Sequence, residues 1–357
     1  MNLKNRLILE EYRSSRHTYV KLGDVVHQRL DELVRQSDIQ VLGIEHRVKA
    51  ERNLSGKLAR KGDRYHSLND LTDLLGARII CFFSDDVDRM GKLVEKTFIV
   101  DWENSTDKRA QIKADTFGYL SLHYICSLPA DEIYPEDIRG KKFEIQIRTA
   151  LQHTWAVIEH DLGYKSEFGV PRAMARSFAR VASLLEIADD EFVRLREDLK
   201  AYTDDIRLKI TENQADDVLI DTVSLQEYMH RNKQMKAFLQ KICAINSAEL
   251  EEISPESYIE QLAWLGKKTL GSLQQMLSEN EDLAYRMAKQ ALERTDLDIL
   301  SSSVGLRFLC RAELLNKQYS ESQVTEFLML STDDEKRAAR MAKSLLKSAP
   351  ETNNFNE

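Results

Sequence analysis

Residues 143–165, with the sequence FEIQIRTALQHTWAVIEHDLGYK, constrain the fold more than any other part of the chain. The stretch begins with strict alternation of apolar and polar side chains, which predicts a β-strand with two different faces. Phe143, Ile145 and Ile147 are expected to face the core. The other face carries a row of three polar side chains, namely Glu144, Gln146 and Arg148. By pattern alone this row fits a half-exposed strand, but a carboxylate near a guanidinium also suits the floor of a phosphate site.

The N-terminal part of the chain is expected to be helical and locally basic. Residues 1–65 are predicted to form helices, with a break at Ser37-Asp38. Between Glu45 and Arg64 there are seven basic and three acidic residues. A positive excess of this kind indicates either a solvated helix face or a polyphosphate partner.

A region of mixed strands and helices is expected to follow. The run ARIICFF at 77–83 is continuously apolar, as is typical of a buried central strand. The expected strands span 77–83, 97–102, 120–128 and 141–149, and the expected helices span 85–97 and 150–162.

Beyond Pro171 the pattern becomes almost wholly helical. Pro171 stands where a proline of a first helical turn belongs. Apolar residues then recur at steps of three or four, which predicts one long helix with a single apolar stripe. Such a stripe is typical of a core or of a seam between copies of the chain, so a homo-oligomer is one expectation. The stripe consists of Met174, Phe178, Val181, Leu185, Ala188, Phe192, Leu195 and Leu199.

The length and the patterning together predict two domains. At 357 residues the chain is long enough for about two. The polar stretch 203–222 is the predicted linker between a first domain at 1–202 and a helical regulatory or oligomerisation domain at 223–347. Residues 348–357 are predicted to be a disordered tail. Helices of the second domain are expected at 225–245, 255–265, 268–277, 281–293, 304–315, 321–330 and 333–346.

Charge and cysteine usage exclude several classes of protein. The formal net charge is −8, so the chain as a whole is not a basic nucleic-acid binder. Its four cysteines are scattered, without a structural zinc signature or a disulfide framework, and Cys81 and Cys126 are expected in the core. No stretch approaches about 20 apolar residues, and the first residues lack the apolar core of a signal peptide. We expect a cytoplasmic protein without a membrane partner.

Four segments, in this order along the chain, resemble the motifs of the RelA/SpoT synthetase domain, the catalytic module of (p)ppGpp alarmone synthetases. The resemblance covers about residues 40–165. The matching segments are RVK at 47–49 with Lys57, DLLGAR at 73–78, GYLSLH at 118–123, and EIQIRT at 144–149 continued by WAVIEHDLGYK at 155–165.

The resemblance implies both a fold and a reaction. The implied fold is α+β, a nucleotidyltransferase-like mixed β-sheet flanked by helices, followed here by an all-helical C-terminal region. The implied reaction moves the β,γ-pyrophosphate of ATP to the ribose 3′-hydroxyl of GDP or GTP. Transfers of this type rest on positioning and on neutralising polyphosphate charge, which takes a divalent metal ion and several cationic side chains.

Roles for individual residues follow from the matching positions. Asp73 and Glu144 are the expected catalytic carboxylates and the ligands of one Mg²⁺ ion. Helical spacing would place Arg47 and Lys57 nearly in phase, with Lys49 rotated away. Arg78 is expected either to bind phosphate or to pair with a carboxylate. The expected ATP-binding residues are Arg47, Lys49, Lys57 and Arg78, and the expected acceptor-binding residues are Tyr119, His123, Gln146 and Arg148.

Three departures from the family pattern leave the acceptor open. Asn53 stands where a serine is usual, Asp115 where a lysine is usual, and Leu120 where an arginine or glutamine is common. One alternative is a RelA/SpoT-like toxin that pyrophosphorylates the 3′ end of tRNA, which would need a basic docking surface. Another is a non-catalytic module that senses nucleotides, which the presence of both carboxylates disfavours.

Overall fold

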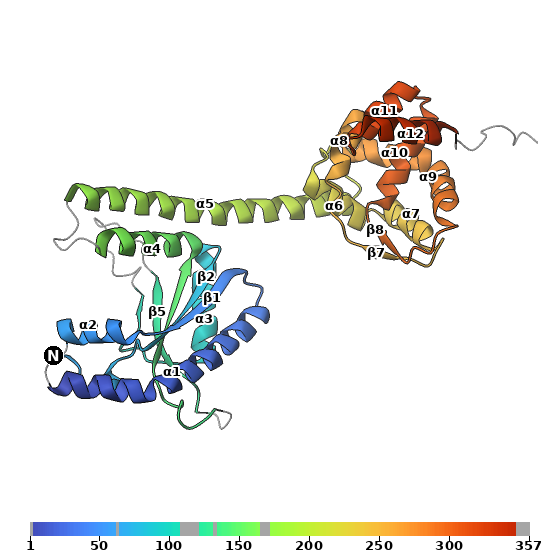
Figure 1. Ribbon diagram of the computed structural model, residues 1–357. Coiled ribbons are helices and arrows are strands. Elements are labelled where there is room, and N and C mark those ends of the chain that lie inside the picture. Colours follow the sequence, from blue (N-terminus) through green and yellow to red (C-terminus); the bar gives the residue numbers. More distant parts are fainter. Residues whose placement is uncertain (1–2, 62–63, 108–120, 131–133, 165–171, 348–357) are drawn as a thin grey trace, which may run out of the picture. The chain divides into compact units, whose positions relative to one another are not determined.

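The chain divides into two compact units, Met1–Glu197 and Asp198–Glu357. Figure 1 shows the computed structural model of both units. Tyr119 and the predicted tail at 348–357 lie outside the residues that it describes. Those described residues are 3–61, 64–107, 121–130, 134–164 and 172–347. Within them, no helix is both long enough and apolar enough to cross a membrane.

A mixed β-sheet forms the centre of the first unit, as predicted. Its strand order is β1-β2-β6-β5-β3, and β4 pairs with β5 at one end. β2 and β6 run parallel, whereas the other paired strands are antiparallel. The strands are β1 Val41–Val48, β2 Leu75–Cys81, β3 Ile99–Val100, β4 Thr106–Asp107, β5 Leu122–Ser127 and β6 Phe143–Thr149.

Helices cover this sheet and close the core. α1 packs on β1 and β2, α3 packs on β6 and β2, and α4 follows β6 directly. Gly91 lets α3 approach β5 closely, since a Cβ at this position would lie 2.8 Å from Leu122 Cδ2. Phe143, Ile145 and Ile147 are fully buried, and Cys81 and Cys126 are also core residues, as predicted. The helices are α1 Leu3–Arg35, α2 Glu51–Lys61, α3 Ser84–Thr97, α4 Ala150–Tyr164 and α5 Arg172–Thr211, with a 3₁₀ turn η2 at Leu68–Asp70.

The prediction that residues 1–65 are all helical is wrong. Val41–Val48 forms β1, which pairs antiparallel with β2. Glu45 and Arg47 alternate with apolar or aromatic neighbours, and this period of two was hidden by the high density of charge. Arg47 therefore lies on a strand, Lys49 follows it, and only Lys57 lies on a helix, α2. The expected helical phase between Arg47 and Lys57 does not apply.

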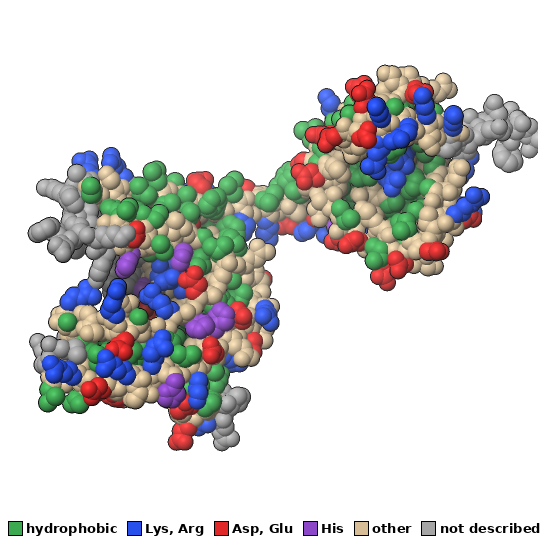
Figure 2. Space-filling view, viewed as in Figure 1, with side chains coloured by type: hydrophobic (Ala, Val, Ile, Leu, Met, Phe, Trp, Pro, Cys, Tyr) green, Lys and Arg blue, Asp and Glu red, His purple; other side chains and the backbone are tan. Residues whose placement is uncertain are grey.

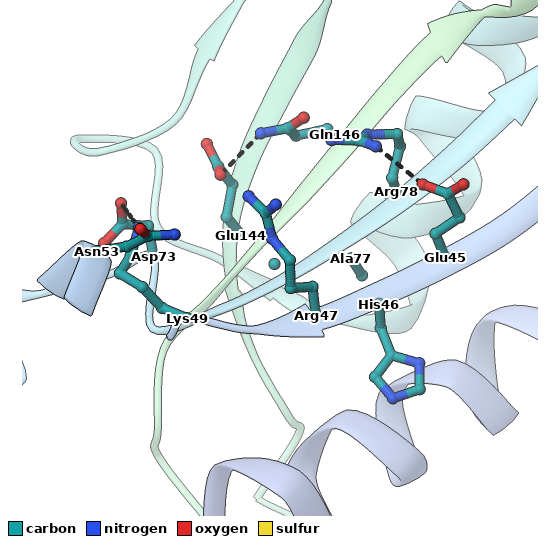
Figure 3. A pocket seen from close by; sticks show the side chains of 11 residues that line it. Glu45, His46, Arg47, Lys49, Asn53, Asp73, Ala77, Arg78, Glu144 and Gln146 are labelled. Atoms are coloured by element: carbon teal, nitrogen blue, oxygen red, sulfur yellow. Dashed lines mark hydrogen bonds and ion pairs between the residues drawn. The ribbon is translucent and has the colours of Figure 1, made fainter. Parts of the chain in front are cut away.

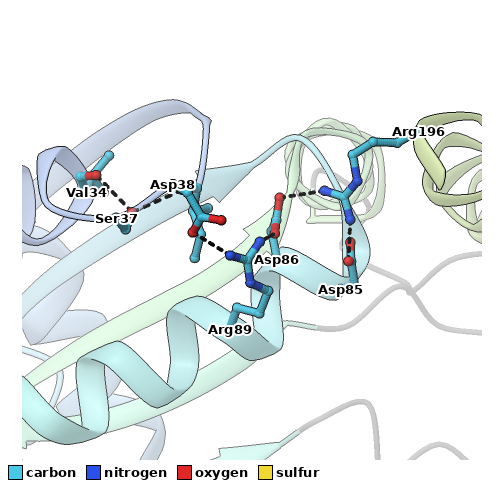
Figure 4. A network of polar contacts seen from close by, with 8 residues as sticks. Val34, Ser37, Asp38, Asp85, Asp86, Arg89 and Arg196 are labelled. Atoms are coloured by element: carbon cyan, nitrogen blue, oxygen red, sulfur yellow. Dashed lines mark hydrogen bonds and ion pairs between the residues drawn. The ribbon is translucent and has the colours of Figure 1, made fainter. Parts of the chain in front are cut away.

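A polar network fastens α5 to the start of α3 within the first unit (Figure 4). Arg196 of α5 donates to Asp86 at 3.0 Å and also pairs with Asp85. Arg89 donates to the same Asp86 at 2.7 Å and pairs with Asp38. The Asp86 side chain is 4% exposed, so this buried carboxylate is neutralised by two guanidinium groups.

The apolar stripe on α5 is largely exposed. Phe178 packs its ring edge-on against Trp155 of α4 at a centroid distance of 5.4 Å. Five of the other seven members are exposed, from 45% at Val181 to 62% at Leu195, so the stripe is not a core of the first unit. Figure 2 shows these apolar side chains along α5.

The second unit is built mainly of helices around its own apolar core. The break expected between the helices at 268–277 and 281–293 is absent, and one continuous helix spans this region. Asn280 stands where the break was expected, but its buried side chain donates to Met276 O and to Glu313 within the helix. Conversely, the helix expected at 225–245 is divided at Asn232, whose side chain caps the second part. The helices are α6 Thr222–Arg231, α7 Lys233–Cys243, α8 Ser257–Trp264, α9 Leu270–Leu292, α10 Val304–Asn316, α11 Glu321–Met329 and α12 Glu335–Lys347.

Two further expectations for this region need correction. It is not all helical, since β7 Glu249–Glu251 and β8 Ile299–Ser301 form a short parallel pair. The predicted linker at 203–222 begins inside α5, because Ile206 and Ile210 are buried in the core of the second unit. Two isoleucines four residues apart were too weak a pattern within this polar stretch to predict a helix.

Candidate active site

A cavity of about 430 Å³ opens on the polar side of the sheet in the first unit (Figure 3). It combines residues from β1, β2 and β6, from the turn before β2, and from α2. This is the volume range of small-ligand sites. Its lining residues are Glu45, His46, Arg47, Lys49, Asn53, Asp73, Gly76, Ala77, Arg78, Glu144 and Gln146.

Strand register explains why these residues meet. Arg47 pairs with Gly76 across β1 and β2, and Gly76 pairs with Glu144 across β2 and β6. Paired residues on adjacent strands project from the same face of a sheet. The neighbouring row in the same register runs through Glu45, Arg78, Gln146 and His123. The cavity is therefore a direct product of the sheet's pairing.

Gly76 leaves space at the centre of the first row. A Cβ built on Gly76 would meet no heavy atom within 4 Å. The register places Gly76 between Arg47 and Glu144, whose side chains extend into the cavity from the strands on either side (Figure 3). A ligand can therefore reach the floor of the sheet between a cation and a carboxylate.

The polar row of β6, whose shared face the alternation predicted, forms a hydrogen-bonded chain. Gln146 Nε2 donates to Glu144 Oε2 at 2.9 Å, and Arg148 Nη2 donates to Gln146 Oε1. Burial, and then the nearby charge of Arg78, lower the pKa of Arg148 to about 10. The Nε donors of Arg78 and Arg148 are buried without a hydrogen-bond partner among the described residues. Arg148 at the end of the row and Arg78 on the neighbouring β2 thus each retain a spare donor.

Glu144 is also held by a histidine from β5. His123 Nδ1 lies 2.7 Å from Glu144 Oε1, and Ser121 Oγ lies 2.7 Å from His123 Nε2. Burial acts to raise the pKa of Glu144. The hydrogen bond and charge of His123 and the hydrogen bond from Gln146 outweigh it, so the pKa is lowered. An ionised Glu144 accepts a hydrogen bond from Nδ1–H of His123, and in that tautomer Nε2 accepts one from the Ser121 hydroxyl.

Asp73 is clamped by two lysines. Lys49 Nζ donates to Asp73 Oδ2 at 2.9 Å, and Lys57 Nζ donates to Oδ1 at 2.8 Å. Burial opposes ionisation of Asp73, but the two lysine hydrogen bonds outweigh burial and lower its pKa. The turn before β2 thus presents an ionised carboxylate together with two ammonium groups.

The two cavity arginines differ in their partners. Arg78 Nη1 donates to Glu45 Oε2 at 2.8 Å, so it takes part in the carboxylate pair that was one of its two expected roles. It also lines the cavity. Arg47, by contrast, makes no hydrogen bond or ion pair with any residue that the structure describes. Its guanidinium is free to receive an anionic ligand.

Asp73 and Glu144 suit a single Mg²⁺ ion. Both line the same cavity, and the charge of Asp73 acts to raise the pKa of Glu144, as expected for neighbouring carboxylates. Across the described ranges, no group of three or more His, Cys, Asp or Glu side chains is arranged to hold a metal. Mg²⁺ is usually bound by one or two carboxylates with phosphate oxygens and water completing its shell, so a two-carboxylate donor set fits this ion.

The cavity brings most of the predicted site residues together. Six of them line it directly, and Lys57 reaches it through Asp73, as His123 does through Glu144. Arg148 lies one hydrogen bond further along β6. Tyr119 lies outside the described residues. The six lining residues are Arg47, Lys49, Asp73, Arg78, Glu144 and Gln146.

Some cavity residues were not predicted from the sequence. Glu45 and His46 were missed because their segment was read as helix, although alternation along Val41–Val48 carried the signal. Gly76 carries no chemistry of its own, so only the register reveals its role. Asn53, recognised only as a departure from the family pattern, lines the cavity.

Comparison with known proteins shows which family the first unit resembles. The family model described as "Region found in RelA / SpoT proteins" matches residues 46–168. The GTP pyrophosphokinase YjbM of Bacillus subtilis is 30% identical over 152 residues, which cover 42% of this chain and 69% of that protein. The GTP pyrophosphokinase YwaC of the same organism is 28% identical over 162 residues, which cover 44% of this chain and 75% of that protein.

Solved structures give weaker matches. The small alarmone synthetase 1 of Bacillus subtilis bound to its product pppGpp is 24% identical, with a TM-score of 0.46 over 54% of this chain and 99% of that one. A GTP pyrophosphokinase family protein from Streptococcus pneumoniae is 26% identical, with a TM-score of 0.44 over 57% of this chain and 97% of that one.

The identity to YjbM, extending over more than two thirds of that protein, agrees with the order of the motifs and with the cavity that they line. The chain belongs to the RelA/SpoT family.

Proposed function

We propose that this protein is a pyrophosphokinase that transfers the β,γ-pyrophosphate of ATP to the ribose 3′-hydroxyl of GDP or GTP. One observation carries the proposal: Asp73, Glu144 and the cations around them line a single cavity in a chain whose relatives are GTP pyrophosphokinases. The product would be an alarmone of the (p)ppGpp type. The reaction is proposed for the cytoplasm, where both nucleotides are abundant.

ATP would occupy the side of the cavity formed by β1, α2 and the turn before β2. Arg47, which has no hydrogen-bond or ion-pair partner within the described ranges, offers its guanidinium to phosphate oxygens. Lys49 and Lys57 would exchange Asp73 for phosphate oxygens as the nucleotide enters. Arg78 is already paired with Glu45 and would contribute through its remaining donors.

Glu144 is the proposed general base. Its pKa is lowered, so it is ionised at neutral pH and can accept the proton of the acceptor hydroxyl. His123 and Gln146 hold its two oxygens, which fixes the direction of the carboxylate. His123 is thereby a positioning residue in the free protein.

Asp73 and Glu144 are also the residues that would hold a Mg²⁺ ion. When bound, Mg²⁺ would neutralise charge on the transferring phosphoryl groups. Nearby Arg148 and Arg78 would neutralise further charge on the acceptor or on the product.

The second unit is proposed to regulate this chemistry, and the exposed stripe of α5 to join copies of the chain. Every proposed catalytic residue lies in the first unit. An exposed apolar surface of this extent is typical of a protein interface. Self-association through Met174, Val181 and Leu195 would bury side chains that now face solvent.

A single assay tests the proposed reaction. The protein is incubated with Mg²⁺ and ATP labelled in the γ-phosphate, together with GDP, GTP, ATP or bulk tRNA, and the products are separated. Label should move as a pyrophosphate to GDP or GTP, with release of AMP. Transfer of the label to tRNA alone would show that the acceptor is tRNA and not GDP or GTP. Absence of AMP in every reaction would contradict a pyrophosphokinase.

A further inference from the structure

The second unit contains a cavity of its own. It measures about 350 Å³ and lies between α9, α10, α11 and α12. Its walls are mainly apolar, and none of the described side chains that line it is acidic. A concave, apolar site with a few polar groups is the usual form of a small-molecule site. The lining residues are Met287, Gln290, Ala291, Arg307, Phe308, Arg311, Leu328, Met341, Ser344 and Leu345.

Two arginines on α10 give this cavity its charge. Arg307 and Arg311 are four residues apart, so they lie on the same face of the helix. Neither forms a hydrogen bond or an ion pair with another part of the described chain, and the guanidinium of Arg307 instead lies 5.9 Å from the ring centroid of Phe308. Like charges at this spacing repel one another and destabilise the free helix.

Arg311 is partly removed from water without gaining a counter-ion from the residues that the structure describes. Burial, and then the charge of Arg307, lower its pKa to about 10. The other titratable groups that act on it are Tyr258 and Cys310, neither of which is an anion at neutral pH. A desolvated cation without a partner costs free energy, and a bound anion would recover that cost.

We propose that this cavity binds a small organic oxyanion, a phosphate or carboxylate group carried on an apolar or aromatic body. Arg307 and Arg311 would bind the oxyanion, since a guanidinium presents paired donors to either group. Met287, Leu328 and Leu345 would contact the body.

Two further features support an anionic ligand. Gln290 and Ser344 place uncharged polar groups on opposite helices of the same cavity, where they can orient the ligand. α12 adds a basic surface beside it, and Figure 2 shows Lys and Arg side chains gathered on this unit. The basic residues of α12 are Lys336, Arg337, Arg340, Lys343 and Lys347.

The test measures binding to the full-length protein, independently of transfer activity. Phenyl phosphate, benzoate, inorganic phosphate and benzyl alcohol are titrated by calorimetry, and thermal unfolding is followed in parallel. Phenyl phosphate or benzoate should bind and raise the unfolding temperature. Whichever of these two compounds binds more tightly shows whether the cavity prefers a phosphate or a carboxylate group. Inorganic phosphate and benzyl alcohol, which each lack half of the ligand, should bind about tenfold more weakly or worse.

Variants locate the binding. Arg311→Gln and Arg307→Gln should each weaken binding about tenfold or more. Without ligand, Arg311→Gln should leave the unfolding temperature unchanged or raise it, because it removes an unpaired charge. A structural arginine would instead lower that temperature. Arg286→Gln is the matched control, since Arg286 is exposed on α9 beside Met287 but does not line the cavity.

A second control separates this cavity from the candidate active site. Arg47→Ala should bind the probes as the unaltered protein does, and loss of binding there would assign the ligand to the first unit. The proposal is overturned by that result, by failure of both organic oxyanions to bind, or by equal losses in Arg286→Gln and Arg311→Gln. Unaltered binding in both the Arg307 and Arg311 variants would overturn it too.

Discussion

Asp73 and Glu144 line one cavity but depend on different partners, so substitutions can separate their contributions. Asp73 is held by two lysines, whereas Glu144 is held by an imidazole and an amide. The surroundings of each carboxylate lower its pKa, which keeps both charged at neutral pH. At the scale of single residues, the site is a set of ionised groups prepared before substrate arrives.

Asp73→Asn and Glu144→Gln should each reduce transfer by orders of magnitude while leaving the protein folded. Both changes keep the shape of the side chain and remove its charge, so they should impair metal binding and, for Glu144, proton acceptance. Turnover with Mg²⁺ and circular dichroism are measured together. Near-normal turnover in either folded variant would show that its carboxylate is not part of the metal site.

The lowered pKa of Asp73 predicts a pH-dependent contribution to stability. A carboxyl group whose pKa is lower in the folded state stabilises the fold above its unfolded pKa of about 3.9, and this contribution is lost as the pH falls through the folded pKa. Asp73→Asn should therefore be less stable than the unaltered protein at pH 7, by about 2 kcal/mol. The difference should shrink below about pH 4. Urea unfolding at several pH values measures it, and a pH-independent difference would contradict the ion-pair origin.

The open space at Gly76 predicts loss of activity without loss of stability. Valine should fit the strand, because a Cβ meets no atom within 4 Å and β-branched residues favour strands. Its side chain would occupy the space between Arg47 and Glu144. Gly76→Val should lower kcat/KM roughly tenfold or more, equivalent to about 1.4 kcal/mol. Gly43→Val is the control, since Gly43 lies on the same sheet with equally open space but outside the cavity. Similar losses in both variants would argue against a substrate in this space.

At the scale of elements, the contact between α5 and α3 depends on one buried carboxylate. Asp86 is shared by Arg89 and Arg196 and is 4% exposed. Asp86→Ala should destabilise the protein by roughly 3 kcal/mol, because it leaves two guanidinium groups without their buried partner. Asp38→Ala removes an exposed partner of the same Arg89, so it should lower the free energy of unfolding much less. Chemical denaturation compares them, and equal losses would mean that burial does not govern this network.

The elements also show where sequence patterns suffice. Alternation at 143–149 predicted both the β6 strand and its polar row, because a period of two leaves few alternatives when the apolar residues are large. The same period in Val41–Val48 went unrecognised, because charged residues at Glu45 and Arg47 stand beside a basic helix. The sequence thus indicated which side chains meet in the cavity better than it indicated the element that carries them.

Pairing between distant segments could not be predicted. The motifs indicated candidate phosphate-binding residues, but only the register of β1 on β2 places Arg47 opposite Gly76. Likewise, no local pattern indicates that Lys49 and Lys57 share Asp73 as a partner. These contacts arise from the folded chain and not from its local periodicity.

At the scale of the whole molecule, the boundary between the two units falls inside α5 rather than in a loop. Ile206 is 1% exposed and Ile210 is 6% exposed, and Arg207 pairs with Glu227 at 2.9 Å. The end of α5 is therefore part of the second unit's core.

A fragment spanning 198–347 should consequently fold cooperatively, whereas one spanning 223–347 should be less stable. The shorter fragment loses Ile206 and Ile210, and burying each is worth about 1.5–3 kcal/mol. Thermal unfolding of the two fragments compares them, with 198–347 carrying Arg207→Gln as a control for the loss of the ion pair alone. Equal stability of the two fragments would place the boundary at the predicted linker.

Ion pairing inside the candidate active site has a consequence for its response to ionic strength. Lys49 and Lys57 already share the negative charge of Asp73, and Arg78 is paired with a neighbouring glutamate, before a nucleotide arrives. Binding is then an exchange of counter-ions, and few dissolved ions are released into the solvent. Arg47, which has no such partner in the described part of the chain, supplies long-range attraction together with the positive charge left where two lysines share one carboxylate. Nucleotide affinity should thus vary with salt concentration far less than the number of cations suggests.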